Sequence, residues 1–571
     1  MSIRTLAICT IVVCCTISTA RSQGVNIDDI GTISGSLQTD AAQYNEDTLI
    51  GAPDVPENIL SNTFVNVLFT RGGFTAGLRF EAYLNPLLGI DPRFASTGAG
   101  TGIGIPYRFA KYEMDIFDVT AGNFYEQFGS GMVLRTYEER NLGFDNSIDG
   151  LRLKFRPTKG LQFTGLIGRQ RVFWDLSEGI IRGADVTMDV HDLLDSLLPS
   201  DMFLTLGASA VSRYQSDQNP FLNLPENVLA WSTRAIFGVG GFQSELEYAY
   251  KINDPGATNG GSYNTGNALY LNLSYSIPNF GINAAAKRID NMDLRSDRTA
   301  AGLAQQVNYL PALTKQHTWR LITLYPYATQ PTGEFGMQGE ATFTIPKGSF
   351  LGDDATTVTL NSSVIHALDT TRQQTVLPSG DTTDNLYYNA NFMWDERIFF
   401  QDINIEIQRK FGKDFKVTLA YINLKYDQDV IERRAAINES KFGVITANFA
   451  VAELWFKTAK TQSLRTELQW MGVTHQPGAE LALQNGDWAM VLFEYTISPN
   501  WFFTVFDEWN YGNEDPDLRI HYPNATVAWV KDALRLQGGY GRVRGGILCV
   551  GGICRPVPAS NGFNLSVQYS F

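Results

Sequence analysis

The last stretch of the chain, residues 561–571, alternates between apolar and polar side chains. On an extended strand, one face carries Phe563, Leu565, Val567, Tyr569 and Phe571, and the other carries Asn564, Ser566, Gln568 and Ser570. A half-buried strand of a soluble sandwich also alternates, so the pattern alone leaves that alternative open. An aromatic at the very end, with the same alternation across most of the sequence, is typical of the closing strand of an outer-membrane β-barrel. We expect the apolar row to act as an assembly signal for the barrel-assembly machinery.

The beginning of the chain is consistent with export. Arg4 precedes an apolar run at residues 6–17, and small residues follow from Ser18 to Ser22. This layout predicts a cleaved signal peptide over residues 1–22, because the run is too short for a transmembrane helix. A lipoprotein signal at Cys14 and Cys15 is rejected, since Val12 and Val13 replace the small residues such a signal needs.

Composition favours one large closed sheet over residues 23–571. The chain is 44% hydrophobic and 12% aromatic, no linker divides it, and no 18-residue apolar run follows the signal. A helical membrane protein is therefore excluded, whereas alternating strands remain compatible with such an average. The net charge of -14 becomes -16 when Arg4 and Arg21 leave with the signal, which argues against nucleic-acid binding.

Short turns and longer polar loops alternate along the second half of the chain. Turns are expected near residues 238–241, 278–279, 412–414, 461–463 and 499–500, and loops at 254–265, 290–312, 427–439, 476–487, 512–524 and 542–561. This predicts an all-β, large antiparallel transmembrane β-barrel of about 22–26 strands, with short periplasmic turns and longer extracellular loops. A first strand is expected at residues 31–44 and a hairpin at 62–83. Residues 386–411 and 440–460 each read as a hairpin or as one long strand, and residues 190–198 as a short amphipathic helix.

Residues 122–154 and the two segments after them are unusually dense in charge. The candidate lumen charge network is Glu126, Arg135, Glu138, Glu139, Arg140, Asp145, Asp149, Arg152, Arg169, Arg171 and Asp175. Such charges must face water or each other in a membrane protein. We expect Arg135, Glu138, Glu139 and Arg140 to face the lumen and to pair with Arg152, Arg169, Arg171 and Asp175. Two interpretations stay open: a neutral brace for a loop folded into the barrel, which near-equal charges favour, and a solute-selecting constriction.

Two other features bear on chemistry. The aromatic stretch at residues 309–336 contains Pro326 and Pro331, which bar a central strand, so it is an irregular connection. Two interpretations stay open: an ordered loop with no binding role, which we favour, and a loop that stacks sugars or caps the barrel. Cys549 and Cys554 flank a tight turn and predict one disulfide, because two thiols alone do not form a zinc site.

Enzyme signatures are absent from the sequence. The five histidines are dispersed, neither HExxH nor GxSxG occurs, and the glycines of residues 95–106 miss the GxGxxG spacing. We therefore expect no cofactor, no metal and no catalytic residue. A Ser/His or Asp/His pair brought together only by folding keeps a barrel hydrolase open as a third hypothesis.

Four stretches carry a family resemblance: GNFYEQFGSGMVLRTYEERNLGFDNS, NYLPALTKQHTWR, YPYATQPTGEFG and GGILCVGGICRPVPASNGF. From about residue 31 to 571 the chain resembles an uncharacterised family of Gram-negative exported proteins. This resemblance implies an outer-membrane location and brings no known substrate, cofactor or catalytic residue.

Two functional classes lead. The first is a porin-like pore or uptake channel for a small hydrophilic solute in the outer membrane of a Gram-negative bacterium. The second is a non-conducting scaffold whose loops contact a protein or a surface polymer. A TonB-driven transporter is disfavoured, because no plug-sized segment precedes the first expected strand. A barrel of this size needs lumen filler, and residues 122–154 are the candidate.

Overall fold

The computed structural model describes residues 25–27, 30–95, 102–194, 198–220, 222–302, 304–349, 352–376, 382–432, 441–482, 484–550 and 553–571. The expected signal peptide, residues 1–22, lies outside these ranges.

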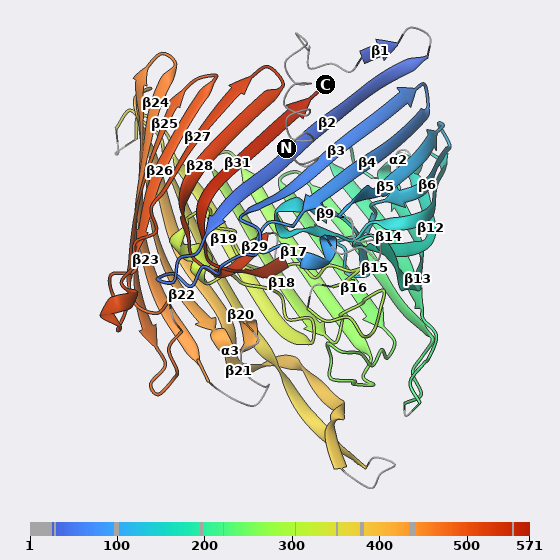
Figure 1. Cartoon of the computed structure of the whole chain (residues 1–571). Helices are drawn as coiled ribbons and strands as arrows, with labels where there is room; N and C mark the ends of the chain where they lie inside the picture. Colours follow the sequence, from blue (N-terminus) through green and yellow to red (C-terminus); the bar gives the residue numbers. More distant parts are fainter. Residues whose placement is uncertain are drawn as a thin grey trace.

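One large antiparallel sheet forms the wall of the molecule (Figure 1). Within the described ranges it has 25 strands. The short strand β1 (Val25–Ile27) pairs with the first residues of β2 (Gly31–Asn45), and the other 24 strands form a closed ring. The ring closes where β31 (Ser560–Ser570) pairs with β2 on one side and with β28 (Leu534–Val543) on the other. Closure leaves no free sheet edge, which an open sheet of this size would expose.

The remaining wall strands follow one another in chain order. The first group is β3 (Ile59–Arg71), β4 (Phe74–Leu84), β5 (Ile103–Glu113), β6 (Phe117–Phe124), β11 (Ile148–Thr158), β12 (Leu161–Val172), β13 (Asp175–Asp189), β14 (Met202–Tyr214), β15 (Asn227–Val239), β16 (Phe242–Lys251), β17 (Gly266–Ile277) and β18 (Phe280–Asp290). The second group is β19 (Gly333–Ile345), β20 (Thr356–Val376), β21 (Thr382–Phe411), β22 (Phe415–Asp427), β23 (Val444–Ala459), β24 (Gln462–His475), β25 (Trp488–Ile497), β26 (Trp501–Trp509) and β27 (Asn524–Lys531).

Small elements occur in the connections. They are η1 (Pro92–Phe94), β7 (Gln127–Phe128), β8 (Leu134–Arg135), β9 (Glu138–Glu139), η2 (Arg140–Leu142), β10 (Phe144–Asp145), α2 (Val190–Leu193), η3 (Leu321–Leu324), α3 (Gln428–Ile431), η4 (Pro516–Leu518), β29 (Gly546–Val550) and β30 (Ile553–Val557).

The two ends of the barrel differ in their connections. At one end, tight turns such as residues 71–74, 239–242 and 531–534 join the strands, and the chain also enters β2 and leaves β31 there (Figure 1). We call this the short-turn end. The opposite, long-loop end carries residues 84–103, 124–148, 290–333 and 543–560 among its connections.

These observations decide several expectations. The all-β antiparallel barrel is confirmed, and 24 wall strands fall within the expected 22–26. Residues 386–411 belong to the single long strand β21, which follows β20 through several register shifts. Residues 444–459 form the single strand β23, and the expected helix near residue 190 is the one-turn α2.

The outer surface of the wall is apolar. Large exposed hydrophobic side chains occur on nearly every wall strand, as in Leu153 and Ile167, Leu246 and Ile282, Leu360 and Ile403, and Leu468 and Phe493. Soluble monomers rarely expose continuous apolar surface beyond a few hundred square ångströms. The exposed apolar row therefore faces outward on each strand, and the polar row faces the lumen.

Candidate functional site

Three connections of the long-loop end fold into the barrel: residues 125–147, the described residues of 291–332 (291–302 and 304–332) and those of 544–559 (544–550 and 553–559). Figure 1 shows β9 and β29 inside the ring of wall strands. Backbone hydrogen bonds join the first two loops, from the Arg135 N–H to the Val307 carbonyl (2.8 Å) and from the Tyr309 N–H to the Gly131 carbonyl (2.9 Å). The third loop is joined to the first because the Arg555 guanidinium donates to the Leu142 carbonyl. The three loops form one body, which we call the loop plug.

A sharp bend brings the first loop against the wall. Gly129 has a φ of +56°, and a Cβ there would lie 2.7 Å from both carboxylate oxygens of Glu247 on β16. Glu247 accepts a hydrogen bond from the Ser130 N–H at 2.8 Å. Only glycine fits both the backbone angle and this close approach, which explains the glycine-rich sequence at this bend.

Apolar packing holds the same loop in place. Met132, Val133 and Leu134 are at most 1% exposed. They pack against inward-facing side chains of the wall and against the second loop, in a cluster that includes Leu166, Ile181, Val211, Val228, Ala249, Ile289, Leu294 and Val307. Burying one such side chain contributes about 1.5–3 kcal/mol.

The second loop packs on the opposite part of the wall. Leu321 and Ile322 of η3, with Tyr325 and Tyr327, belong to a larger apolar cluster with Ile422, Tyr426, Phe449, Met471 and Trp488. The Tyr325 ring lies 5.4 Å from that of Tyr426, and the Tyr327 ring 5.0 Å from that of Phe400. Both tyrosines are at most 7% exposed, so these rings fill the lumen and are not available to stack on a sugar.

A buried ionic cluster ties the first loop to β4 and β12. Arg79 and Arg171, from the wall, both contact the Asp145 carboxylate, at 2.6 and 2.7 Å. Arg171 also pairs with Glu81 at 2.6 Å, and Arg79 pairs with Glu81 and with Glu138 of the loop. We call Arg79, Glu81, Glu138, Asp145 and Arg171 the latch cluster. All except Glu138 have side chains that are at most 7% exposed.

The charges of the latch cluster balance when the neighbouring Arg140 is included. Arg140 of η2 pairs with Glu138 at 2.9 Å, which gives three cations and three anions. Burial raises the pKa of Asp145, but Arg171 and Arg79 outweigh it, so that its pKa lies below the ordinary 3.8. Asp145 therefore stays ionised in the plug at any physiological pH.

Several predicted network residues lie in this region with other partners. Arg140 also donates to Gln38 of the wall at 3.2 Å. Arg152 and Lys154 of β11 pair with Glu126 at 3.1 and 2.9 Å. Arg135 lies over two rings, those of Tyr309 (4.0 Å) and Tyr137 (4.7 Å).

The remaining predicted residues lie outside the cluster. Glu139 caps η2 by accepting from the Asn141 N–H, and Asp149 faces the exposed Arg108 at 3.4 Å. Arg169 is exposed in the outward row of β12, and Asp175 is exposed beside the turn between β12 and β13. The partners of the loop thus differ from those expected, because strand register turns Arg169 to the outer face.

Sequence reasoning missed other ion pairs in the interior of the barrel. Arg544–Glu508 (3.1 Å) and Arg320–Glu508 join the loop plug to β26. Lys287–Glu334 (2.6 Å) joins β18 to β19 within the wall, and Arg213–Asp254 (2.6 Å) joins β14 to the connection between β16 and β17. The missed signal is positional: Arg79 and Glu81, or Lys287, are charged residues in the inward row of a strand. Reading each strand face separately would have found them.

Two histidine–aspartate pairs form only on folding. His317 of the second loop lies 2.7 Å from Asp402, and His521 lies 2.6 Å from Asp507. Asn404 also donates to Asp402 at 2.7 Å. Across the described ranges, no serine or threonine hydroxyl bonds to either histidine, so the arrangement lacks a neighbouring nucleophile.

A polar corridor remains beside the plug. Inward-facing side chains of β28, β31, β2 and β3 carry amides, hydroxyls and charges and are partly exposed: Arg535, Gln537, Ser566, Gln568, Ser36, Gln38, Asp40 and Asn66. Two observations show that this row of side chains points into the lumen. Gln38 contacts Arg140 of the plug, and Gln568 is directly opposite Gln38 in the strand register. Among the described residues, neither of the two large apolar clusters includes a residue of β2, β3, β28 or β31; a small cluster of Phe64, Tyr83 and Phe94 touches this part of the wall at β3.

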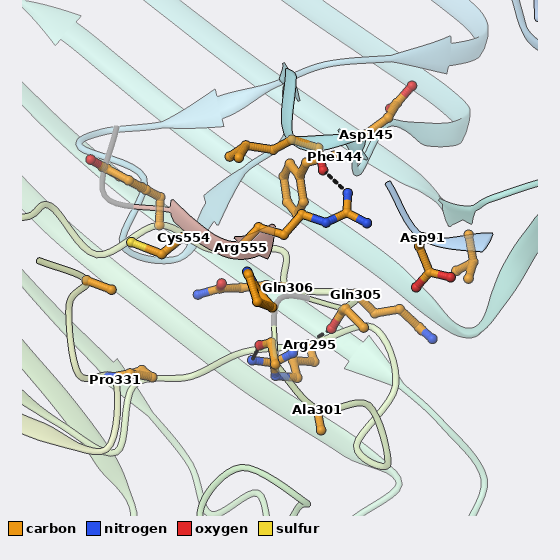
Figure 2. A pocket seen from close by; sticks show the side chains of 18 of the residues that line it. Asp91, Phe144, Asp145, Arg295, Ala301, Gln305, Gln306, Pro331, Cys554 and Arg555 are labelled. Atoms are coloured by element: carbon orange, nitrogen blue, oxygen red, sulfur yellow. Dashed lines mark hydrogen bonds between the residues drawn. The ribbon is translucent and has the colours of Figure 1, made fainter. Parts of the chain in front are cut away.

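A cavity of about 490 Å³ lies between the three loops on the side of the long-loop end (Figure 2). Its lining includes Phe94, Phe144, Arg171, Arg295, Gln305, Gln306, Tyr309, Thr329, Gln330 and Arg555. Gln305 has a φ of +60°, an uncommon value for a residue with a side chain, and the Ser296 N–H donates to its carbonyl at 2.9 Å. The backbone is therefore held in a costly conformation where it borders the cavity.

The structure also bears on the cysteine pair, on membrane-spanning helices and on metal sites. Strand register puts Cys549 of β29 directly opposite Cys554 of β30; the side chain of Cys549 is outside those described, so the disulfide stays a prediction. No helix within the described ranges combines the length and apolar composition needed to cross a membrane. In the same ranges, no group of three or more His, Cys, Asp or Glu residues is arranged to hold a metal ion.

Sequence comparison identifies the family. The model of a family described as being of unknown function, DUF6029, matches residues 3–571. The chain belongs to this family. No curated protein matches the chain.

Solved structures similar to this DUF6029 chain are barrels with little sequence identity. The siderophore receptor PirA from Pseudomonas aeruginosa is 10% identical with a TM-score of 0.41, covering 94% of this chain and 80% of that one. The translocation pore of the P pilus usher PapC is 9% identical with a TM-score of 0.38, covering 94% and 99%. OccK3 from Pseudomonas aeruginosa is 12% identical with a TM-score of 0.34, covering 78% and 96%.

Proposed function

We propose that this protein is an outer-membrane uptake channel for a small hydrophilic solute, with the loop plug restricting its lumen. The polar corridor carries this proposal. A non-conducting scaffold barrel does not require a partly exposed polar wall beside its plug. A hydrophilic solute that crosses the barrel does require such a wall. We further propose that the signal peptide is cleaved, that the long-loop end is extracellular, and that Cys549 and Cys554 form a disulfide.

The membrane setting is supported by rings of aromatic side chains near both ends of the outer surface. Near the short-turn end, rings pack in pairs such as Phe117–Phe155, Phe411–Phe415 and Trp501–Trp529. Near the long-loop end, exposed aromatics include Tyr248, Tyr421, Trp470, Trp509 and Tyr540. Aromatic girdles of this kind flank the apolar band of outer-membrane barrels.

The spacing of the girdles suits a bilayer. Trp501 and Trp509 begin and end β26. At about 3.3 Å per residue they lie roughly 26 Å apart along the strand, or about 20 Å along the barrel axis at a tilt near 40°. An apolar band about 25 Å tall, flanked by the girdles, is typical of such barrels, and the spacing along β26 is of this order.

Planar-bilayer recording tests the channel. We expect the reconstituted protein to produce unitary conductance steps. Gln568 faces the corridor, so Gln568→Lys should move the reversal potential in a salt gradient toward anion preference, and Gln568→Glu toward cation preference. The two variants are matched in position and opposite in charge. Equal selectivity in both would place the conducting path elsewhere.

A scaffold remains the second candidate. The two apolar clusters between plug and wall favour it, because dry packing of this extent resists opening. Folded, heat-modifiable protein that leaves bilayers silent under all conditions would reject the channel and leave the scaffold. A hydrolase would require a nucleophile next to one of the two histidines, and we do not propose it.

A further inference from the structure

The cavity between the three loops contains an imbalance between its acids and its bases. Its lining carries the carboxylates Asp91, Asp145 and Glu432 and the guanidinium groups of Arg93, Arg171, Arg295 and Arg555. A solute can bind most easily to a charged group that does not already have a partner of opposite charge.

Every carboxylate in the lining is engaged. Asp91 accepts from the Arg93 side chain at 2.7 Å, and Asp145 is held by the latch cluster. Both oxygens of Glu432 lie 3.2 Å from the Gln428 side-chain amide that donates to them. A cationic solute would therefore have to displace an existing partner at each of these acids.

Two of the arginines are saturated as well. Arg171 contacts Glu81, Asp145 and the Phe173 carbonyl. Arg295 pairs with Asp293 at 2.7 Å and donates to the carbonyls of Gly302 and Ala304. Arg93 is paired with Asp91 and is 62% exposed.

Arg555 differs from all three. Among the described residues its hydrogen-bond partner is a neutral group, the Leu142 carbonyl, and no carboxylate forms an ion pair with it. A guanidinium has five N–H donors, so most of its donors are unused. Figure 2 shows Arg555 extending into the cavity from β30, with Gln306 beside it. The Asp91 carboxylate attracts Arg555 only at longer range and is itself paired with Arg93. A partly buried cation without a direct ion-pair partner is costly, and a bound anion would offset that cost.

The rest of the lining suits a hydroxylated molecule. The side chains of Gln305, Gln306 and Gln330 bring amide groups to the lining, and Gln305 and Gln330 each use one bond within the plug. Phe144 and Tyr309 add aromatic surface, and Arg135 covers one face of the Tyr309 ring. A few polar groups among aromatic walls, in a cavity within the 300–1,000 Å³ range, are typical of small-molecule sites.

We propose that this cavity binds a sugar-sized, hydroxylated organic anion, with its carboxylate or phosphate on Arg555 and its hydroxyls on the glutamine amides. The proposal deepens the proposed uptake function by naming the solute class, and it rests on that function only for the passage of the solute. The binding site would lie within the loop plug, on the side of the long-loop end.

Calorimetry on the purified protein in detergent tests the site without requiring conduction. The probes are D-glucuronate, D-glucose 6-phosphate and D-glucose, which separate a carboxylate, a phosphate and a neutral sugar of similar size. We expect at least one of the two anions to bind about 10-fold or more tightly than glucose, since a charge-assisted contact is lost with the neutral sugar.

Variants locate the contact. Arg555→Gln should weaken anion binding about 10-fold or more while leaving the glucose signal unchanged, and Arg555→Lys should restore part of it. The matched control is Arg535→Gln, which removes an arginine from the corridor near the short-turn end, at 2.7 Å from Gln537. Anion affinity should survive in that control.

The outcomes separate the two proposals. Equal binding of glucose and both anions, or unchanged anion affinity in Arg555→Gln, would overturn the site even if the barrel conducts. Anion binding that depends on Arg555 in a protein that never conducts would uphold the site and reject the channel.

Discussion

Asp145→Asn is the sharpest perturbation of the plug that the structure offers. The substitution keeps the size of the side chain and removes one charge from the latch cluster. Arg79 and Arg171 lie 2.6 and 2.7 Å from this carboxylate, and both side chains are 3% exposed. With Arg140 included, three cations would then face two anions.

The magnitude follows from burial. Removing one partner of a buried ion pair costs about 3–5 kcal/mol. Each arginine keeps another carboxylate, Glu81 or Glu138, so we take the lower end, about 3 kcal/mol. This corresponds to a roughly 100-fold larger population of the opened loop.

Hydrogen exchange measured by mass spectrometry reads this population directly. The N–H groups of Arg135, Thr136 and Asn146 donate to the carbonyls of Val307, Glu126 and Tyr137, so they exchange only when the first loop opens. Peptides covering residues 134–147 should exchange roughly 100-fold faster in Asp145→Asn. The wall strands and residues 320–327, which are held by apolar packing, should keep their protection.

The control and the refuting result are both defined by the structure. Asp175→Asn removes an exposed acid beside a turn and should leave exchange of residues 134–147 unchanged. Unchanged protection of the loop in Asp145→Asn would show that the latch cluster does not hold it. Equal loss of protection across the whole barrel would show that the effect is global and not a local opening.

Three further predictions concern the titration of Asp145, the closing strand at Phe571 and the cysteine pair. Because the pKa of Asp145 is lowered, its stabilising contribution is complete above pH 3.8 and is lost as pH falls through its still lower folded value; opening of residues 134–147, corrected for intrinsic exchange, should be flat from about pH 5 to 8 and rise below about pH 4. Deleting Phe571, whose backbone N–H and carbonyl both bond to Gly35, should lower the heat-resistant fraction on unboiled gels, while full assembly would refute a closing role for this residue. Alkylation of denatured, unreduced protein should leave Cys549 and Cys554 unlabelled, and two labelled thiols would refute the disulfide.

Sequence reasoning predicted the parts of the fold that depend on local pattern. The alternation at residues 561–571 marks a strand with one wet face, and β31 takes that form between β28 and β2. Turns rich in glycine and asparagine, such as Asn279 with a φ of +65°, can be located because few residues tolerate that backbone angle. Residues 386–411 were ambiguous, because the register shifts that let β21 run for 30 residues leave no clear trace in the pattern.

Of the contacts inside the barrel, the sequence indicates the charged loop but not the apolar packing of the second loop. Residues 122–154 stood out because their charges cannot face lipid, and that argument needs no partner. Leu321 and Ile322 gave no such signal, because a buried aliphatic side chain inside the lumen and a lipid-facing one outside are the same residue types. The pairing of Arg79 with Asp145 depends on two segments 66 residues apart in sequence, and nothing local to either specifies the contact.

Apolar packing and ionic contacts hold the plug on different parts of the wall. Apolar clusters occupy the inner faces of the arc from β12 to β25, where Val211, Ile422 and Phe449 are at most 1% exposed. The corridor and the latch residues Arg79 and Glu81 lie on the arc from β28 through β31 to β4, where most inward side chains are charged or polar, whereas Arg171 of the latch cluster lies on β12. Exchange of an ionic contact for water is less costly than exposure of a dry apolar face, because water solvates the separated charges. Any opening of the lumen therefore belongs on the arc that includes β2, with residues 291–332 staying in place on the opposite wall. Arg555 holds the first loop through the Leu142 carbonyl, so an anion bound to Arg555 would compete with that carbonyl for its N–H donors.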